Sequence, residues 1–286
     1  MSLIENALGK HRTEGPQVRT GAHLLDVLSR PVEPPHTPRN FQVDLESLRQ
    51  QGYLPEAAEE RRLADHYRQV KRPLIRTALG SEQDPLMRLI LVTSPLPGDG
   101  KTFTSINLAM SLARERDTTA LLIDADLPKA HISRAFGLHE QPGLIDALAD
   151  DALDAESLIL RTNINGLDVL PAGKWNEGVT ELVSSARMSE IATRLASRSP
   201  RRLVMMDSPP LLVSIEARAL VQIPGQVVLV VRSGKTPRQA VLDAVGQIDS
   251  KKLQGLVLND ARWNAGSGYY DYSYYGAPPD GTSRKG

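Results

Sequence analysis

From about residue 59 onward, short apolar runs alternate with stretches in which apolar residues recur every three or four positions. Near-continuous aliphatic runs are typical of strands that a parallel sheet buries on both faces, and the three-to-four spacing is typical of helices that cover such a sheet. The predicted strands are 89–93, 120–123, 167–170, 203–206, 227–231 and 255–258. The predicted helices are 59–79, 102–115, 144–149, 180–197, 215–221 and 238–248.

Strands that alternate with helices in this way predict an α/β fold with a mostly parallel sheet and helices on both faces. Residues 1–57 contain several prolines and only two short apolar patches, so we expect an extension that carries one or two short docking helices. Residues 58–263 form the predicted domain. Residues 264–286 contain no Val, Ile, Leu or Met and cannot build a core, so we expect a disordered tail.

Charge and cysteine content exclude several classes of function. The 286 residues carry 34 Lys and Arg against 34 Asp and Glu, which argues against a broad electrostatic grip on nucleic acid. The absence of cysteine excludes disulfides, thiolate metal sites and a cysteine nucleophile. The longest apolar runs are only strand-sized, and residues 1–10 lack the apolar core of a secretory signal, so we expect a cytoplasmic protein.

A glycine-containing loop joins the strand at 89–93 to the helix at 102–115. It reads Ser-Pro-Leu-Pro-Gly-Asp-Gly-Lys-Thr over residues 94–102. Such a loop can wrap backbone amides around phosphates, with Lys101 at the β- and γ-phosphates and the Thr102 hydroxyl on Mg²⁺. Pro95 stands where the pattern G-x-x-x-x-G-K-[ST] has its first glycine. The alternative is a turn that merely precedes Lys-Thr.

Carboxylates follow two other predicted strands. Asp124 and Asp126 end one strand, and Asp207 ends another, just before Ser-Pro-Pro. Because the carboxyl ends of parallel strands share one edge of a sheet, these groups can converge on the phosphate loop. There they would hold Mg²⁺ and orient a nucleophile. Each aspartate alone is more often a turn or helix cap. Together with the loop, they predict ATP and magnesium as ligands.

These three motifs resemble the Walker A, A′ and B motifs of the bacterial tyrosine kinases, the BY-kinases. The resemblance runs from about residue 65 to residue 275 and includes Leu-Pro-Ala-Gly at 170–173 and Leu-Val-Leu-Asn at 256–259. Together with Glu-Leu-Val-Ser-Ser-Ala-Arg-Met at 181–188, these segments are similar to the autokinases of exopolysaccharide loci associated with exosortase systems. The resemblance implies a P-loop NTPase-like fold.

The resemblance also implies an enzymatic activity. The chain would be a non-specific protein-tyrosine kinase that transfers phosphate from ATP to its own C-terminal tyrosines. Lys101, Asp124, Asp126 and Asp207 are the expected catalytic residues. The metal would be held by Thr102, Asp124 and Asp207. ATP would contact Gly98, Asp99, Gly100, Lys101, Thr102, Phe103 and, near the adenine, Asn259. The expected acceptors are five of the seven tyrosines of the chain, Tyr269, Tyr270, Tyr272, Tyr274 and Tyr275.

A subunit interface and a departure from the motif can also be placed. The E-x-x-R-x-x-R motif that joins subunits of this family into rings corresponds to Asp65, Arg68 and Lys71. Lysine keeps the charge but lacks the planar fork of arginine. The A′ motif normally continues to an arginine at position 128, where this chain has Pro128 followed by Lys129. Three histidines, His66, His131 and His139, show no metal-ligand spacing and are expected at the surface or at helix ends.

The implied partners are further copies of the chain, a separate membrane-bound polysaccharide chain-length regulator that activates the kinase, and a phosphotyrosine phosphatase. The regulator would recruit the chain to the inner face of the cell membrane. The main alternative is the related group of partition and division-site ATPases, a nucleotide-dependent switch or scaffold with little kinase activity. Their loop has an extra lysine where this chain has Leu96, and a hydrolytic switch has no use for five clustered tyrosines.

Overall fold

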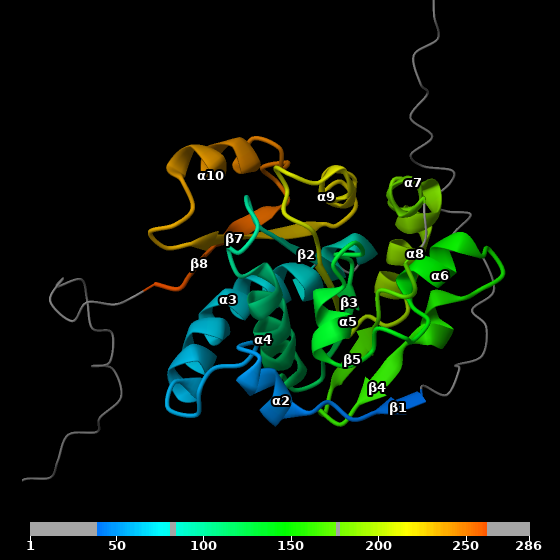
Figure 1. The fold of residues 1–286 in the computed structure, drawn as a ribbon, viewed down its shortest axis with the longest axis horizontal. Coiled ribbons are helices and arrows are strands. Elements are labelled where there is room, and N and C mark those ends of the chain that lie inside the picture. Colours follow the sequence, from blue (N-terminus) through cyan, green and yellow to red (C-terminus); the bar gives the residue numbers. More distant parts are fainter. Residues whose placement is uncertain (1–38, 81–83, 176–177, 262–286) are drawn as a thin grey trace, which may run out of the picture.

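An eight-stranded sheet forms the centre of the structure, a computed structural model that describes residues 39–80, 84–175 and 178–261 (Figure 1). The strand order is β1-β4-β5-β3-β6-β2-β7-β8. Within the described residues, β4 and β5 pair antiparallel and all other neighbouring strands pair parallel. The bounds are β1 Arg39–Phe41, β2 Leu89–Thr93, β3 Thr119–Asp124, β4 Leu160–Thr162, β5 Leu167–Leu170, β6 Arg202–Asp207, β7 Gln226–Arg232 and β8 Leu253–Asn259. The prediction of a mostly parallel α/β fold is confirmed.

Helices cover both faces of this sheet. The bounds are α2 Leu45–Gln50, α3 Glu60–Gly80, α4 Lys101–Ala113, α5 His131–Ala135, α6 Leu144–Ala149, α7 Val179–Val183, α8 Ala186–Ser197, α9 Ile215–Leu220 and α10 Arg238–Val245, with 3₁₀ turns η1 Pro85–Arg88 and η2 Ala155–Leu158. Helices α2 to α5 contribute to one hydrophobic cluster and α6 to α10 to the other. Along β2, Leu89 and Leu91 join one cluster while Ile90 and Val92 join the other. This alternation explains why β2 is apolar throughout.

The central strands place the carboxylates side by side. In the parallel register of β3 and β6, Asp124 lies directly opposite Asp207. Strand β2, which leads into the glycine loop, pairs with the other side of β6. The carboxyl ends of these three strands therefore meet at one edge of the sheet, as the positions of the motifs predict.

The folded part begins earlier than predicted. Strand β1 pairs with β4, the Val43 amide donates to Asn163 Oδ1 at 2.8 Å, and Leu48 of α2 is buried in the core. Residues 39–57 thus belong to the α/β unit, and the predicted boundary at residue 58 is wrong. The reason is that a three-residue strand and a six-residue helix are too short to show a periodic pattern. Residues 1–38 and 262–286 lie outside the described residues.

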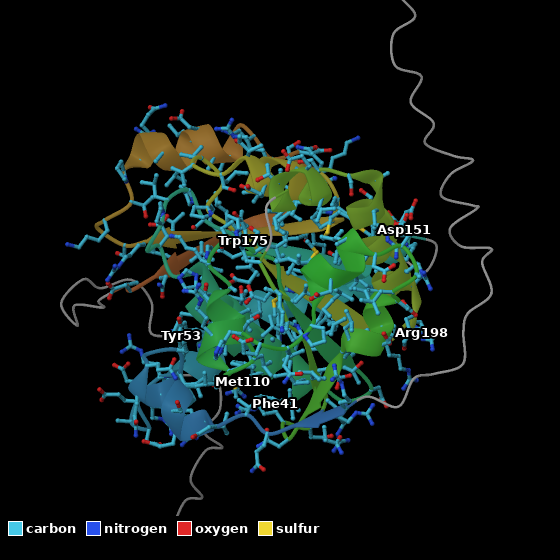
Figure 2. All side chains as sticks on the ribbon, turned by 45° about the vertical axis from the view of Figure 1, so that its right-hand side comes forward. Phe41, Tyr53, Met110, Asp151, Trp175 and Arg198 are labelled. Atoms are coloured by element: carbon cyan, nitrogen blue, oxygen red, sulfur yellow. The ribbon has the colours of Figure 1, made fainter. Side chains whose placement is uncertain are left out.

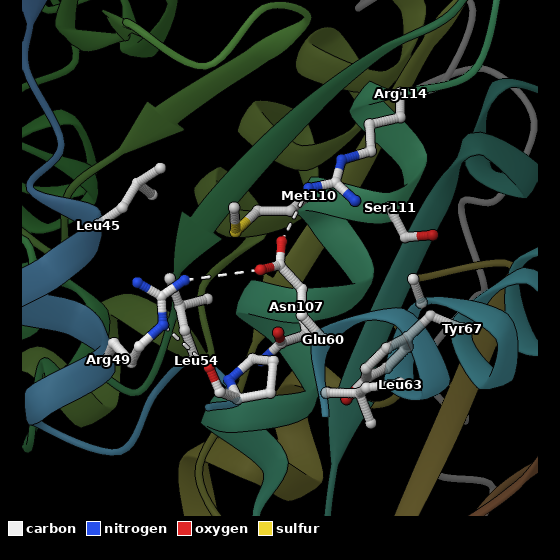
Figure 3. Close-up of a pocket in the computed structure, with 12 residues that line it drawn as sticks. Leu45, Arg49, Leu54, Glu60, Leu63, Tyr67, Asn107, Met110, Ser111 and Arg114 are labelled. Atoms are coloured by element: carbon white, nitrogen blue, oxygen red, sulfur yellow. Dashed lines mark hydrogen bonds and ion pairs between the residues drawn. The ribbon is translucent and has the colours of Figure 1, made fainter. Parts of the chain in front are cut away.

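A pocket of about 80 Å³ lies where α2 meets α3 and α4 (Figure 3). Glu60 of α3 pairs with Arg49 of α2 at 3.6 Å and with Arg114, just after α4, at 3.8 Å. The apolar residues that line the pocket include Leu54 and Met110. The pocket faces the second half of α4, whereas the glycine loop precedes the first turn of that helix. These contacts tie residues 45–55 to the domain.

Two other predictions need correction. The predicted helix 180–197 is two helices, because Ser184 ends α7 and Ser185 takes an extended conformation before α8 begins. Strand β4 and helix α5 were not predicted, since each has five residues or fewer. Among the described residues, no helix combines the length and apolarity that crossing a membrane requires.

Candidate active site

The conformation of the glycine loop between β2 and α4 is fixed by its glycines and by hydrogen bonds to a buried side chain of the loop. Gly98 and Gly100 have φ angles of 83° and 96°, which only glycine adopts without strain. The Asp99 carboxylate is buried and accepts hydrogen bonds from the Leu96 amide at 2.9 Å and the Thr236 hydroxyl at 2.6 Å. Asp99 therefore holds the shape of the loop with its side chain, and only its backbone amide is left for a phosphate.

The end of β8 closes against this loop. Asn259 Nδ2 donates to the Asp99 carbonyl at 3.0 Å, and a Cβ atom at Gly100 would lie 1.9 Å from the same nitrogen. Gly100 is thus required both for its φ angle and for the close approach of Asn259. Asn259 lies at the loop, as the resemblance implies, and its contact with adenine stays a prediction.

The predicted catalytic groups come together at the first turn of α4. Lys101 Nζ donates to Asp126 Oδ2 at 2.6 Å, and the Thr102 hydroxyl donates to Asp207 Oδ2 at 2.8 Å. The second Asp207 oxygen accepts from the Ser105 hydroxyl at 2.9 Å. All of these side chains are buried. The site is therefore a network in which each cation or hydroxyl faces a carboxylate.

Burial and mutual charge set the protonation of the cluster. Burial, reinforced by Asp207, raises the pKa of Asp124 to about 7. Burial also raises the pKa of Asp207. The pKa of Asp126 is lowered, because the contacts with His131 and Lys101 outweigh its burial. Burial alone would lower the pKa of Lys101, but the attraction of Asp207 and Asp126 is larger and raises it. Lys101 and Asp126 are therefore an ionised pair.

Asp124 provides the test of whether the site suits a metal ion. Its Oδ2 accepts from the Ser133 amide and hydroxyl, both at 2.7 Å, whereas among the described residues its buried Oδ1 has no hydrogen-bond partner. A buried carboxylate oxygen without a partner suits a divalent cation. In the described part of the chain no three His, Asp or Glu side chains form a complete metal site. A metal here would need the Thr102 hydroxyl and oxygens from phosphate or water.

Sequence reasoning missed several residues of the site. Ser133 and Ser105 hold the two buried aspartates, but isolated serines give no signal before α5 and α4 are placed. His131 begins α5, one of the two expected settings, and its Nδ1 lies 3.5 Å from Asp126 Oδ2, a contact that the sequence does not show. Tyr53 was assigned to the extension, yet its carbonyl accepts from Asn107 of α4 at 2.8 Å. Burial is the main cause that raises the pKa of Tyr53, and the negative charge of Asp207 raises it further. The Tyr53 hydroxyl therefore interacts electrostatically with the cluster.

The predicted subunit-interface residues differ in exposure. Asp65 and Arg68 form an exposed ion pair on α3. Lys71 is buried, where its Nζ donates to the Ser111 carbonyl at 2.8 Å and pairs with Glu115 at 2.7 Å. Its ammonium group therefore joins α3 to α4 and is not presented to a neighbouring subunit, which corrects the prediction for this residue.

Other predicted residues fall in different places. Phe103 lies in the first turn of α4, where its carbonyl accepts from Asn107 at 2.8 Å. Pro128 and Lys129 are exposed in the turn after β3. The five tyrosines of the tail lie outside the described residues.

Comparison with known proteins places this geometry in a family. The model of a family described as an AAA domain matches residues 87–250. The tyrosine-protein kinase YwqD of Bacillus subtilis is 33% identical over 195 residues, which are 68% of this chain and 79% of that protein. The putative tyrosine-protein kinase EpsB of Ralstonia solanacearum is 33% identical over 73% of this chain. The chain spans less than a third of the length of EpsB.

Solved structures agree with the sequence relatives. The kinase domain of VpsO is 30% identical with a TM-score of 0.59, and the alignment covers 72% of this chain and all of that one. The BceF tyrosine kinase domain is 26% identical with a TM-score of 0.54, over 77% of this chain and 98% of that one. With a family model that matches more than half of the chain and a kinase relative that is covered over most of its length, the chain belongs to the bacterial tyrosine-protein kinases.

Proposed function

We propose that this chain is an ATP-dependent protein-tyrosine autokinase that phosphorylates the tyrosine cluster of its own C-terminal tail. The observation that carries the proposal is the convergence of Lys101, Thr102 and three aspartates at the carboxyl ends of β2, β3 and β6. The tail adds the acceptor, because Tyr269 follows the last residue of β8 by only ten positions. Asn259 at the end of β8 contacts the glycine loop, two residues before the described chain ends.

The reaction is transfer of the γ-phosphoryl group of ATP. A bond forms between the tyrosine oxygen and the γ-phosphorus, the bond from that phosphorus to the β,γ-bridging oxygen breaks, and ADP leaves. The phenolic proton passes to a carboxylate of the cluster or to water. Backbone amides of Gly98 to Lys101 bind phosphate oxygens, and Lys101 neutralises their charge. Asp126, kept ionised by its lowered pKa, holds Lys101 and orients the tyrosine hydroxyl.

The oxygen donors of the cluster support magnesium as the metal. Thr102, Asp207 and the free Oδ1 of Asp124 would hold it, directly or through water. When bound, Mg²⁺ neutralises charge on the phosphates during transfer. Asp124 must give up its proton before it can ligate, because its pKa is about 7. We therefore expect the metal to bind more tightly above pH 7 than below it.

The activity is tested by the intact mass of the purified chain after incubation with Mg-ATP. The wild type should show a ladder of up to five added phosphates. A chain with all five tail tyrosines replaced by phenylalanine should show none of these additions, and neither should Lys101→Met. A wild type that binds ATP but gains no phosphate, even with an activator segment present, would instead favour the ATP-dependent switch or scaffold.

We further propose that transfer occurs between subunits of an oligomer, with the exposed Asp65 and Arg68 of α3 at the interface and a ring as one possible assembly. Five phosphotyrosines would add about −7.5 to −10 charges to a chain with no net charge, enough to drive subunits apart. Native mass measurement of the unphosphorylated and phosphorylated forms tests this. An equal oligomer mass for both forms would contradict it.

The kinase relatives suggest the biological setting. The resemblance of the motifs supports a role in exopolysaccharide synthesis or export, and the exosortase-associated branch stays a prediction. A membrane-bound polysaccharide chain-length regulator would activate the kinase at the inner face of the membrane, and a phosphotyrosine phosphatase would reset it. A pull-down from membranes with wild type and Asp65→Ala, Arg68→Ala chains would identify the partners.

A further inference from the structure

Exposed apolar side chains stand beside the candidate active site. Trp175 is 57% exposed, Val213 60% and Ile215 66%. A folded chain gains by covering such groups, at about 25 cal/mol for each Å² removed from water. Trp175 follows β5, and the two aliphatic residues follow β6, so all three lie beyond carboxyl ends of strands. Figure 2 labels Trp175 near the middle of the side-chain view.

The sheet order sets these residues on either side of the catalytic cluster. Strand β3, which ends at Asp124, lies between β5 and β6. Loops after β5 and β6 therefore flank the loop after β3, which carries Asp126 and His131. The ends of β5 and β6 are two strand spacings apart, about 9.5 Å.

The loop after β6 is fixed to the glycine loop. The Leu211 amide donates to the Ser94 carbonyl at 2.8 Å, and the Leu212 amide donates to the Pro95 carbonyl at 3.3 Å. Val213 is the next residue. Its position is thus set by the same backbone that begins the phosphate site.

Glu216 holds Ile215 and Val213 outward. Its two carboxylate oxygens accept from the Thr180 hydroxyl of α7 at 2.5 Å and from the Ser214 hydroxyl at 2.6 Å. Ser214 also caps α9 by accepting from the Ala217 amide at 3.1 Å. These bonds fix the start of α9 against α7, so Ile215, the first residue of α9, cannot turn inward without breaking them.

Hydrogen bonds also fix the conformation of the loop that carries Trp175. Asp146 Oδ2 accepts from the Gly143 amide at 2.7 Å and the Lys174 amide at 3.4 Å. A Cβ atom at Gly173 would lie 2.5 Å from that oxygen, and its φ angle is 91°. Two loops of defined shape thus carry the exposed apolar groups, and they follow the strands on either side of β3.

We propose that Trp175, Val213 and Ile215 form an acceptor rim that binds the aromatic ring of the tyrosine to be phosphorylated, supplied by the tail of this chain, residues 264–286. This inference rests on the proposed function and assigns its specificity for tyrosine. The tail fits because, without Val, Ile, Leu or Met, tyrosine rings are its main apolar groups. From Ala261, the last described residue, to Tyr269 the chain spans at most about 28 Å, which is the length available to carry the first acceptor to the rim of a neighbouring copy.

The test uses two full-length chains. The enzyme carries serine at all five tail tyrosines, and the acceptor carries Lys101→Met with its tail intact. Val213→Ser with Ile215→Ser in the enzyme should raise the KM for the acceptor about tenfold, and Trp175→Ala should do the same. The affinity for nucleotide and the kcat at saturating acceptor should stay within about twofold of the parent. Leu242→Ser, which removes an exposed leucine from α10, is the matched control and should change neither.

A second arm needs no catalysis. In the serine-tail chain with Trp263→Phe, Trp175 is the remaining tryptophan, and a peptide of residues 264–286 should change its fluorescence in a saturable way. The same peptide with serine for tyrosine should not, and a phenylalanine version should compete for the rim. Saturable binding without transfer would keep the rim and reject the kinase. An unchanged KM in the rim variants, no peptide response, or a changed oligomer mass in place of a changed KM would overturn the rim.

Discussion

The catalytic cluster and the acceptor rim are neighbours at one edge of the sheet, yet they break opposite rules of protein stability. The cluster buries ionisable groups, among them Asp124 and Asp207 in direct register on adjacent strands. The rim exposes apolar groups, Val213 and Ile215. Removing charged groups from water costs free energy. Leaving aliphatic groups in water gives up the stabilisation that their burial would provide. We propose that both departures mark ligand sites, one for phosphate and metal, the other for an aromatic ring.

The largest effect should come from removing the cation of the cluster. Lys101→Met leaves Asp126 without its charged partner and removes a phosphate contact, so transfer should fall at least about 10²–10³-fold. Stability should fall by about 3–5 kcal/mol. Phosphate incorporation and chemical denaturation measure the two effects.

Lys71→Met is the control for this variant, because Lys71 is also a buried lysine with an acidic partner but lies at the other end of α4. It should lose stability while its transfer rate per folded molecule stays near that of the wild type. A similar loss of transfer in both variants would contradict the assignment of Lys101.

Replacing Asp124 should separate stability from activity. Since its folded pKa of about 7 lies above the ordinary 3.8, folding favours the protonated form, and wild-type stability should fall as the pH rises from about 4 to 7. Asp124→Asn should flatten this dependence and raise stability at pH 8 by about 1–3 kcal/mol. Transfer should fall about 100-fold because a metal ligand is lost. Thermal unfolding at several pH values checks the sign, and a stability profile that is unchanged by the substitution would refute it.

The join between β8 and the glycine loop should be sensitive to a single methyl group. Gly100→Ala would place its Cβ against Asn259 Nδ2 and strain the φ angle, so ATP should bind about tenfold more weakly. Because Asn259 is a side-chain contact, adding Asn259→Ala should recover part of that loss. Titration calorimetry with a non-hydrolysable ATP analogue measures it, and no recovery in the double variant would assign the whole loss to the backbone.

The smallest effect is expected at the rim. Val213→Ser with Ile215→Ser should change the free energy of unfolding by less than about 0.5 kcal/mol, because both side chains are already exposed. A large loss of stability would mean that these residues pack in the folded chain, and the contrast between cluster and rim would fail.

The strongly patterned parts of the molecule could be predicted from the sequence. Strand β2 and helix α6 have the predicted ends, because buried strands show continuous aliphatic runs and helices a clear three-to-four spacing. The loop and the three aspartates could be predicted because they follow strands whose ends share one edge. Their contacts with Ser133 and His131 could not, since these depend on a five-residue helix without a local signal.

The rim shows a different limit. Val213 and Ile215 lie in a Leu-Leu-Val-Ser-Ile segment that suggests core packing, and only their exposure in the folded chain shows that they lie at the surface. Lys71 shows the same limit in reverse. A lysine in a charged helix is expected to be exposed, but Lys71 is buried against Ser111. Exposure of single residues depends on the tertiary structure and cannot be derived from a sequence pattern.

We propose that a site built on Lys101 phosphorylates the tail of another copy. The most direct measurement mixes an isotope-labelled Lys101→Met chain with unlabelled wild type and Mg-ATP, then maps phosphates on labelled peptides. We predict phosphotyrosine on the labelled chain between Tyr269 and Tyr275. ATP-bound wild type that leaves every labelled tyrosine unmodified would contradict the claim.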